Sequence, residues 1–150
     1  MNKMRLVVQR VKKAKVLKVS DQKVVGEIGL GLFVLVGFKK GDSETTVQQL
    51  AVKLFKLRVM ADDQERMNKS VSEVGGKILV VSQFTLYADT KGGNRPSFIN
   101  AEEPEKAKKL YEYFISKLRE LGVEIETGSF GDYMEIDASL DGPVTVILES

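Results

Sequence analysis

The 150-residue sequence contains no cysteine and no histidine, and it has only three prolines. Without cysteine the chain has no disulfide, no thiolate metal site and no thiol nucleophile. Without histidine it has neither a serine–histidine–aspartate triad nor an imidazole proton shuttle. An enzyme of this composition therefore works without the side chain that most often performs acid–base chemistry near neutral pH.

Long hydrophobic runs are also missing. The longest apolar run, Leu32–Val36, has the length of a strand, whereas a membrane-spanning helix needs about 20 apolar residues. The first ten residues carry charges and lack the apolar block and cleavage site of a secretory signal. We therefore expect a cytoplasmic protein that does not bind a membrane.

The composition is that of a folded protein, with 43% hydrophobic and 29% charged residues. Net charge is only +2, yet the ends of the chain differ strongly in sign. Residues 1–23 hold eight bases and one acid, and residues 124–150 hold seven acids and no base. The basic end is suited to bind phosphates, or the two ends pair as neighbouring strands with complementary charges. The two interpretations are compatible, and the sequence leaves both open.

Hydrophobic periodicity predicts about seven strands and two helices in a single domain that spans residues 1–150. Asp42 or Ser43 is expected to cap the first helix, and Gly122 to end the second. The fold class is therefore α/β, with mixed, mostly antiparallel β-sheets that form a barrel-like core beside two main helices. The expected strands cover residues 5–19, 24–28, 32–37, 77–87, 123–127, 133–138 and 144–148, and the expected helices begin near 44 and at 104 and end near 57 and 121.

The first candidate for chemistry is the sequence Ser-Gln-Phe-Thr-Leu-Tyr at residues 82–87, at the end of a buried strand. Strand alternation places Ser82 and Phe84 on one face and Gln83 and Thr85 on the other. Ser82 or Thr85 is a possible nucleophile, but a hydroxyl needs an activating base and the chain has no histidine. The alternative is an ordinary strand end with hydrogen-bonded hydroxyl groups.

The second candidate is the loop at residues 91–98, Lys-Gly-Gly-Asn-Arg-Pro-Ser-Phe. Its glycines, together with Lys91 and Arg95, would let backbone N–H groups and cations approach a phosphate. The spacing is not that of a P-loop, so the loop does not indicate a nucleoside triphosphate site. An ordinary exposed loop explains the same sequence.

The third candidate is Asp141-Gly142-Pro143, before the last expected strand. Such a sequence is commonly only a turn, and a cis Gly–Pro bond is the sharper alternative. The nearby acids Asp132, Asp137 and Asp141 lack the spacing of a calcium-binding loop. We expect no metal and no cofactor.

Five segments stand out in order along the chain: residues 4–11 (MRLVVQRV), 25–29 (VGEIG), 82–89 (SQFTLYAD), 95–98 (RPSF) and 141–145 (DGPVT). Together, over residues 4–150, they resemble the D-aminoacyl-tRNA deacylase family, also known as the D-Tyr-tRNA deacylase family. The first three residues lie outside this resemblance and look like an extension. One departure is Leu140, which stands where the family commonly has asparagine.

The resemblance implies a homodimer that hydrolyses the ester between a D-amino acid and the 3′-terminal adenosine of tRNA. It also implies that glycine mischarged on tRNA is a substrate and that L-aminoacyl-tRNA is rejected. In the family, a cis Gly–Pro pair, here Gly142-Pro143, reaches into the partner's pocket and leaves no room for an L side chain. Phe130 corresponds to a position beside the terminal adenine, and Arg10 is expected to hold the Gly–Pro loop at the dimer interface. The catalytic pocket corresponds here to Ser82, Gln83, Phe84 and Thr85.

Two mechanisms and two other functions remain open at this point. In the mechanism that we favour, water attacks the ester while a backbone N–H near Phe84 or Thr85 stabilises the oxyanion, with help from Gln83 or the ribose 2′-hydroxyl. The rival mechanism uses Thr85 as a covalent nucleophile. The other functions are a non-catalytic RNA-binding module and a threonine hydrolase that acts on small esters without RNA.

Overall fold

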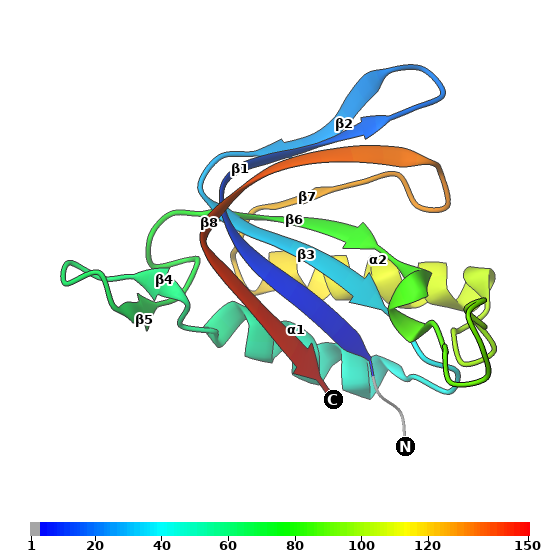
Figure 1. The fold of residues 1–150 in the computed structure, drawn as a ribbon. Coiled ribbons are helices and arrows are strands. Elements are labelled where there is room, and N and C mark those ends of the chain that lie inside the picture. Colours follow the sequence, from blue (N-terminus) through cyan, green and yellow to red (C-terminus); the bar gives the residue numbers. More distant parts are fainter. Residues whose placement is uncertain (1–3) are drawn as a thin grey trace.

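One long strand, β1 (Arg5–Lys18), organises the sheet of the computed structural model, which describes residues 4–150 (Figure 1). Its first half pairs antiparallel with β3 (Gly31–Gly37) and its second half pairs antiparallel with β2 (Lys23–Ile28). Its other edge pairs antiparallel with β8 (Met134–Glu149). Beyond β3 the sheet continues with β6 (Lys77–Ser82) and then β7 (Ile125–Thr127), both in parallel pairing.

The sheet curls until β2 lies against β7, which nearly closes a barrel. Gly26 permits this approach, because a Cβ atom there would lie 2.3 Å from the carbonyl oxygen of Thr127. The expected barrel-like core, with mixed and mostly antiparallel pairing, is confirmed. Its buried side chains come from four strands and are Val11, Ala14, Val16, Ile28, Phe33, Leu79 and Val81.

Two helices, α1 (Glu44–Lys56) and α2 (Pro104–Glu120), cover the other face of the sheet (Figure 1). Both expected helices are confirmed. The side chain of Ser43 caps α1 by accepting a hydrogen bond from the Thr46 N–H, and Gly122 follows α2 with a φ of +100°. The larger of the two cores lies between these helices and the sheet, with Phe114, Leu50 and Leu54 fully buried.

The strand expected over residues 77–87 is too long. β6 ends at Ser82, and Phe84–Tyr87 form a 3₁₀ helix. The predicted alternation of residues 82–87 between two faces is therefore wrong. Apolar residues at Phe84 and Leu86 continue the pattern of the strand, so the pattern alone does not mark its end.

Two other predictions about strands are corrected. The strands expected at 133–138 and 144–148 are one strand, β8, because pairing with β1 continues on both sides of Gly142-Pro143. A small hairpin of β4 (Met60–Ala61) and β5 (Met67–Lys69) was not expected, because two- and three-residue strands carry no readable periodicity.

The opposite charges at the two ends of the chain meet across β1 and β8. Arg5 Nε lies 3.3 Å from a Glu149 carboxylate oxygen, and Lys18 Nζ lies 3.6 Å from Asp132. Arg10 forms a third pair, described below. The interpretation as neighbouring strands with complementary charges is confirmed for these three bases. Within residues 4–150, the other lysines of residues 12–23 form no ion pair.

Candidate active site

The segment Ser82–Thr85 leaves the sheet where the parallel strands β3 and β6 end. The Gln83 N–H donates to the carbonyl oxygen of Val36 at 2.8 Å, a backbone hydrogen bond to β3 just past the end of β6. The chain then turns, with N–H groups of Leu86 and Ala88 bonded to the carbonyl oxygens of Gln83 and Thr85. The carboxyl ends of parallel strands are a common place for binding sites in α/β proteins.

This turn presents backbone donors to solvent. Phe84 is 56% exposed, and Thr85 is exposed as well. Within residues 4–150, the N–H groups of Phe84 and Thr85 have no acceptor, and the hydroxyl groups of Ser82 and Thr85 are bonded to no base. The arrangement thus offers two N–H donors for a developing negative charge, but it does not activate a hydroxyl nucleophile.

Arg5 and Gly37 hold the turn in place. Arg5 donates from Nη1 to the Leu86 carbonyl oxygen at 2.6 Å and lies over the Tyr87 ring, 4.9 Å from its centroid. A Cβ atom on Gly37 would lie 3.0 Å from Leu86 Cβ and 3.1 Å from the Gln83 carbonyl oxygen. Neither residue is marked as functional by the sequence pattern, because Arg5 is one of many bases and Gly37 has the position of a strand end.

The Gly142-Pro143 pair forms an exposed bulge in β8. Gln9 of β1 faces Thr145, and Val11 of β1 faces Leu140. The four residues of β8 from 141 to 144 therefore lie opposite a single residue of β1, Arg10. The Gly142–Pro143 peptide bond is cis, and Gly142 has a φ of +119°. Leu140, the departure from the family pattern, is 46% exposed and follows the register of β1.

Arg10 contacts the base of this bulge. Its Nε atom lies 3.2 Å from a carboxylate oxygen of Asp141, and its Nη1 atom donates to the Val59 carbonyl oxygen at 2.9 Å. The Arg10 side chain is only 13% exposed, so solvent screens the ion pair less than it would at the surface. Arg10 therefore ties the residue before Gly142 to both β1 and the start of the hairpin.

The bulge and the turn lie far apart within one chain. Arg5 contacts the turn and Arg10 contacts the bulge, and five residues of extended strand span about 17 Å. An aminoacyl group is much shorter than this separation of the two anchoring residues along β1.

Phe130 lies on the side of the sheet that carries the helices. Its ring is half-buried, 5.6 Å from the ring of Tyr111, whose hydroxyl group donates to the Val80 carbonyl oxygen at 2.8 Å. Burial raises the pKa of Tyr111 to about 12. Through Tyr111, Phe130 thus packs beside Val80 of β6, and Val80 lies two residues before the segment Ser82–Thr85.

A family model described as D-Tyr-tRNA(Tyr) deacylase matches residues 7–149. The chain belongs to this family. A "D-aminoacyl-tRNA deacylase" of Shouchella clausii is 52% identical over 98% of this chain and 99% of its own length, and one of Aquifex aeolicus is 50% identical over 98% of each. A solved structure titled "c-Myc DNA Unwinding Element Binding Protein" superimposes with a TM-score of 0.91 at 38% identity, covering 97% of this chain and 98% of that one.

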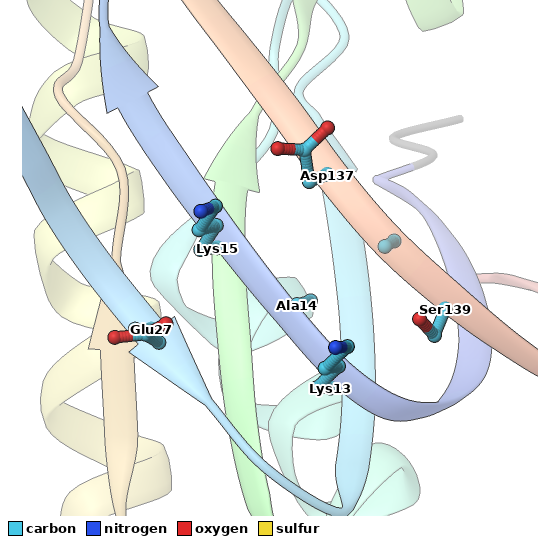
Figure 2. Close-up of a pocket in the computed structure, with 7 residues that line it drawn as sticks. Lys13, Ala14, Lys15, Glu27, Asp137 and Ser139 are labelled. Atoms are coloured by element: carbon cyan, nitrogen blue, oxygen red, sulfur yellow. The ribbon is translucent and has the colours of Figure 1, made fainter. Parts of the chain in front are cut away.

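The deacylase fold also carries a surface hollow that contains none of the predicted site residues. It has a volume of about 420 Å³ and lies over β1, β2 and β8 (Figure 2). Lys13 and Lys15 line it together with Glu27, Asp137 and Ser139, so its charges are of both signs. We therefore assign the candidate site of this deacylase family member to the turn and the bulge rather than to this hollow.

Two further properties of the described part of the deacylase chain bear on ligands. No three of the acidic side chains in residues 4–150 are grouped so that they would hold a metal ion. Over the same residues, neither helix has the length and the apolar character needed to cross a bilayer.

Proposed function

We propose that this chain hydrolyses the ester bond of D-aminoacyl-tRNA and releases free D-amino acid and tRNA. Its membership of the D-Tyr-tRNA deacylase family over residues 7–149 carries this proposal. The substrate class comes from the names of relatives that are about half identical over their whole length. The reaction would serve as a chiral quality control of translation in the cytoplasm.

In the proposed mechanism, a water molecule attacks the carbonyl carbon of the ester. The N–H groups of Phe84 and Thr85 donate to the oxyanion, and the side-chain amide of Gln83 is a third donor at the same turn. The bond between the carbonyl carbon and the ribose oxygen then breaks, and the leaving oxygen takes the proton that water releases. The neighbouring 2′-hydroxyl of the terminal ribose assists this transfer, because no histidine is present.

Thr85→Val tests the rival mechanism. Within residues 4–150, no base contacts the Thr85 hydroxyl group, so we expect the variant to retain single-turnover hydrolysis of D-Tyr-tRNA within about threefold. Loss of a covalent nucleophile would instead lower the rate by about 1,000-fold or more. A Ser82→Ala variant, measured in parallel, controls for the other hydroxyl of the turn.

Gly37→Ala tests the role of the turn itself. The new methyl group would press on Leu86 Cβ and on the Gln83 carbonyl oxygen, which shifts the N–H donors of the turn. We expect single-turnover hydrolysis to fall by about 100-fold, since small displacements of positioning groups have effects of this size. Gly29→Ala is the control, because a Cβ atom there meets no atom within 4 Å; an equal loss in both variants would contradict the proposal.

The proposed active unit is a homodimer. A partly exposed apolar row crosses the sheet on the face away from the helices, where half-buried Val7 pairs with half-buried Leu35 on one side and with Ile147 on the other. Ile147 is 61% exposed, and such a row is suited to be covered by a second copy. A two-fold arrangement would also bring the bulge of one copy next to the turn of the other. Within one chain the bulge and the turn are held at separate points of β1.

In this dimer the bulge selects the substrate. Gly142 and Pro143 are exposed and carry only a hydrogen atom and a compact ring, so their backbone carbonyl groups are accessible to a substrate amino group. A D side chain then points to solvent, whereas an L side chain collides with the bulge. Glycine has no side chain to collide and is expected to be a substrate. Phe130 is assigned to the terminal adenine and Arg10 to the support of the bulge.

The proposal is tested with D-Tyr-tRNA, L-Tyr-tRNA, Gly-tRNA and a free D-Tyr ester. We expect rapid release of D-Tyr and glycine from tRNA and little release of L-Tyr. Binding of tRNA without release would indicate the RNA-binding module. Cleavage of the free ester at a comparable rate would indicate a small-ester hydrolase.

A further inference from the structure

The loop at residues 89–98 is not used by the proposed reaction, although it lies beside the turn. Reciprocal hydrogen bonds of 2.7 and 2.8 Å join the backbones of Asp89 and Ser97 and close the base of the loop. The loop carries Lys91 and Arg95 and one acid at its base, Asp89, whose carboxylate accepts a hydrogen bond from the Lys91 backbone N–H; residues 90–101 contain no acid. Every residue from Lys91 to Asn100 is exposed. The loop is thus a projecting, positively charged segment with a fixed base.

A second basic segment is joined to this loop. Lys39 forms a β-bridge with Ala101, and the Lys40 N–H donates to the Asn100 carbonyl oxygen at 3.0 Å. The backbone contacts therefore place Lys39 and Lys40 beside the end of the loop.

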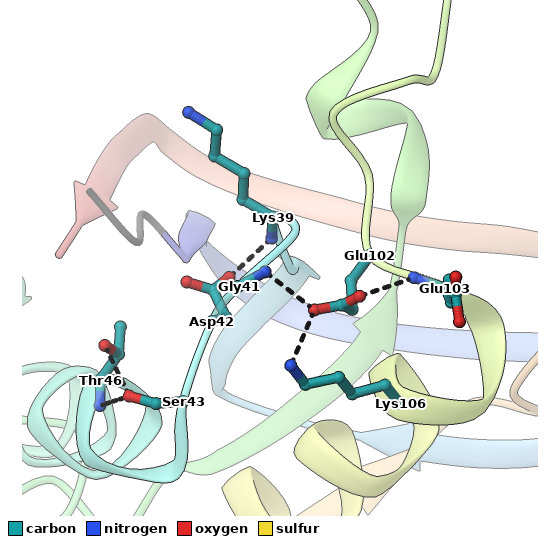
Figure 3. A network of polar contacts seen from close by, with 8 residues as sticks. All are labelled: Lys39, Gly41, Asp42, Ser43, Thr46, Glu102, Glu103 and Lys106. Carbon is teal, nitrogen blue, oxygen red and sulfur yellow. Dashed lines mark hydrogen bonds and ion pairs between the residues drawn. The ribbon is translucent and has the colours of Figure 1, made fainter.

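The acids of this region are engaged elsewhere. Glu102 accepts hydrogen bonds from the N–H groups of Gly41 and Glu103 and lies 3.4 Å from Lys106 Nζ (Figure 3). Asp42 accepts a hydrogen bond of 2.6 Å from the backbone N–H of Lys39. The ammonium group of Lys39 points away from both carboxylates (Figure 3). Both carboxylates accept hydrogen bonds from backbone N–H groups, and within residues 4–150 neither forms a hydrogen bond or ion pair with the Lys39 ammonium group.

Four cations of this region are therefore free. Among the described residues 4–150, the side chains of Lys39, Lys40, Lys91 and Arg95 form no ion pair and no hydrogen bond. This distinguishes them from Arg5 and the other bases that pair across β1 and β8. Lys40, Lys91 and Arg95 are exposed and Lys39 is half-buried. Cations without an ion-pair partner bind phosphates readily, because they have no such partner to release.

Exposed aromatic rings adjoin these cations. Phe84 is 56% exposed and Phe98 is 36% exposed, and their ring centroids lie 4.9 Å apart in an edge-to-face arrangement. Phe98 belongs to the loop, whereas Phe84 belongs to the turn of the candidate site. An aromatic face beside cations is the usual platform for an unpaired nucleotide, whose base stacks while its phosphate is neutralised.

We propose that this loop surface, formed by Lys39, Lys40, Lys91, Arg95 and Phe98, binds the single-stranded 3′ end of the tRNA. The proposal rests on the proposed function, because it places the terminal adenosine at the turn and the preceding nucleotides on the loop surface. The cations neutralise the phosphates of these nucleotides, and Phe98 stacks on one of their bases. Recognition is independent of sequence and adds affinity for tRNA without touching the ester.

The double variant Lys91→Ala/Arg95→Ala tests this assignment. We expect KM for D-Tyr-tRNA to rise about tenfold with kcat unchanged, and the slope of log KM against log salt to fall by about 1.4, as for two phosphate contacts on a single strand. Hydrolysis of D-Tyr-adenosine, which lacks those phosphates, should be unchanged. Lys53→Ala/Lys56→Ala, at the far end of α1, removes the same charge from exposed positions and should leave KM unchanged.

Binding of uncharged tRNA separates this inference from the proposed function. Intact tRNA should bind the Lys91→Ala/Arg95→Ala and Phe98→Ala variants more weakly than the wild type, and tRNA without its single-stranded 3′ end should bind all three equally. Equal affinities for intact tRNA would overturn the inference even if the enzyme is an active deacylase. If wild type sediments as a dimer but a loop variant sediments as a monomer, the loop surface contacts a second copy of the chain and not tRNA. That result would also overturn the inference. If the wild-type protein binds tRNA as expected but hydrolyses neither D-Tyr-tRNA nor D-Tyr-adenosine, the proposed function is contradicted and this inference is not.

Discussion

Replacing Gly142 with alanine is expected to lower the hydrolysis of D-Tyr-tRNA by about 100-fold while the fold is retained. Gly142 has a φ of +119°, and a Cβ atom there would lie 2.9 Å from Val144 Cγ2 and 3.0 Å from the Val144 nitrogen. The bulge must therefore change its backbone to accept the methyl group. Because the bulge is exposed, the change affects the carbonyl groups presented to the substrate more than it affects the core.

Gly75→Ala is the matched control for this variant. Gly75 also has a positive φ, +70°, but a Cβ atom there meets nothing within 4 Å, and the residue lies outside the candidate site. Both variants are compared by single-turnover rate and by circular dichroism. If Gly142→Ala hydrolyses D-Tyr-tRNA as fast as Gly75→Ala does, the bulge has no part in the reaction.

The largest expected loss of stability follows from Phe114→Ala. The Phe114 side chain is 0% exposed and lies on α2 in the core between the helices and the sheet. Its removal leaves a cavity that rigid neighbouring strands fill poorly, so the free energy of unfolding should fall by about 3–5 kcal/mol. Urea unfolding at one fixed protein concentration measures this change, because the stability of a dimer depends on concentration.

Tyr133→Ala provides the comparison at the surface. Tyr133 is 83% exposed, and its backbone carbonyl group, rather than its ring, accepts a hydrogen bond from Val19. Its removal should alter the free energy of unfolding by no more than about 0.5 kcal/mol. Similar losses in the two variants would mean that the helix–sheet core does not dominate stability.

The sequence predicted those parts of the fold that rest on periodicity. The strand at Arg5 and the helix at Pro104 are long, and their apolar residues recur at the spacing of their element. The 3₁₀ turn after Ser82 escaped prediction because its shape depends on contacts with Arg5 and Gly37, which are distant in sequence. A local sequence pattern carries no information about contacts between residues so far apart in the chain.

The candidate site was reached through resemblance more than through periodicity. Residue types alone left Ser82 and Thr85 as possible nucleophiles, whereas the structure leaves them without a base among the described residues. A tie between Arg10 and the Gly–Pro loop was expected only from the family resemblance, because the ion pair of Arg10 with Asp141 depends on the register of β1 against β8. That register also separates the bulge from the turn, which is the reason for proposing that the site needs two copies.

Activity of mixed dimers tests that central proposal most directly. Gly142→Ala damages the bulge and Gly37→Ala damages the turn, so each variant alone should hydrolyse D-Tyr-tRNA poorly. If the site combines the bulge of one copy with the turn of the other, each mixed dimer contains one intact site. Unfolding and refolding the two variants together at equal amounts should then restore about one quarter of wild-type activity, since half of the dimers are mixed. Mixtures no more active than the separate variants would contradict a site shared between subunits, provided that mass spectrometry detects the mixed dimer.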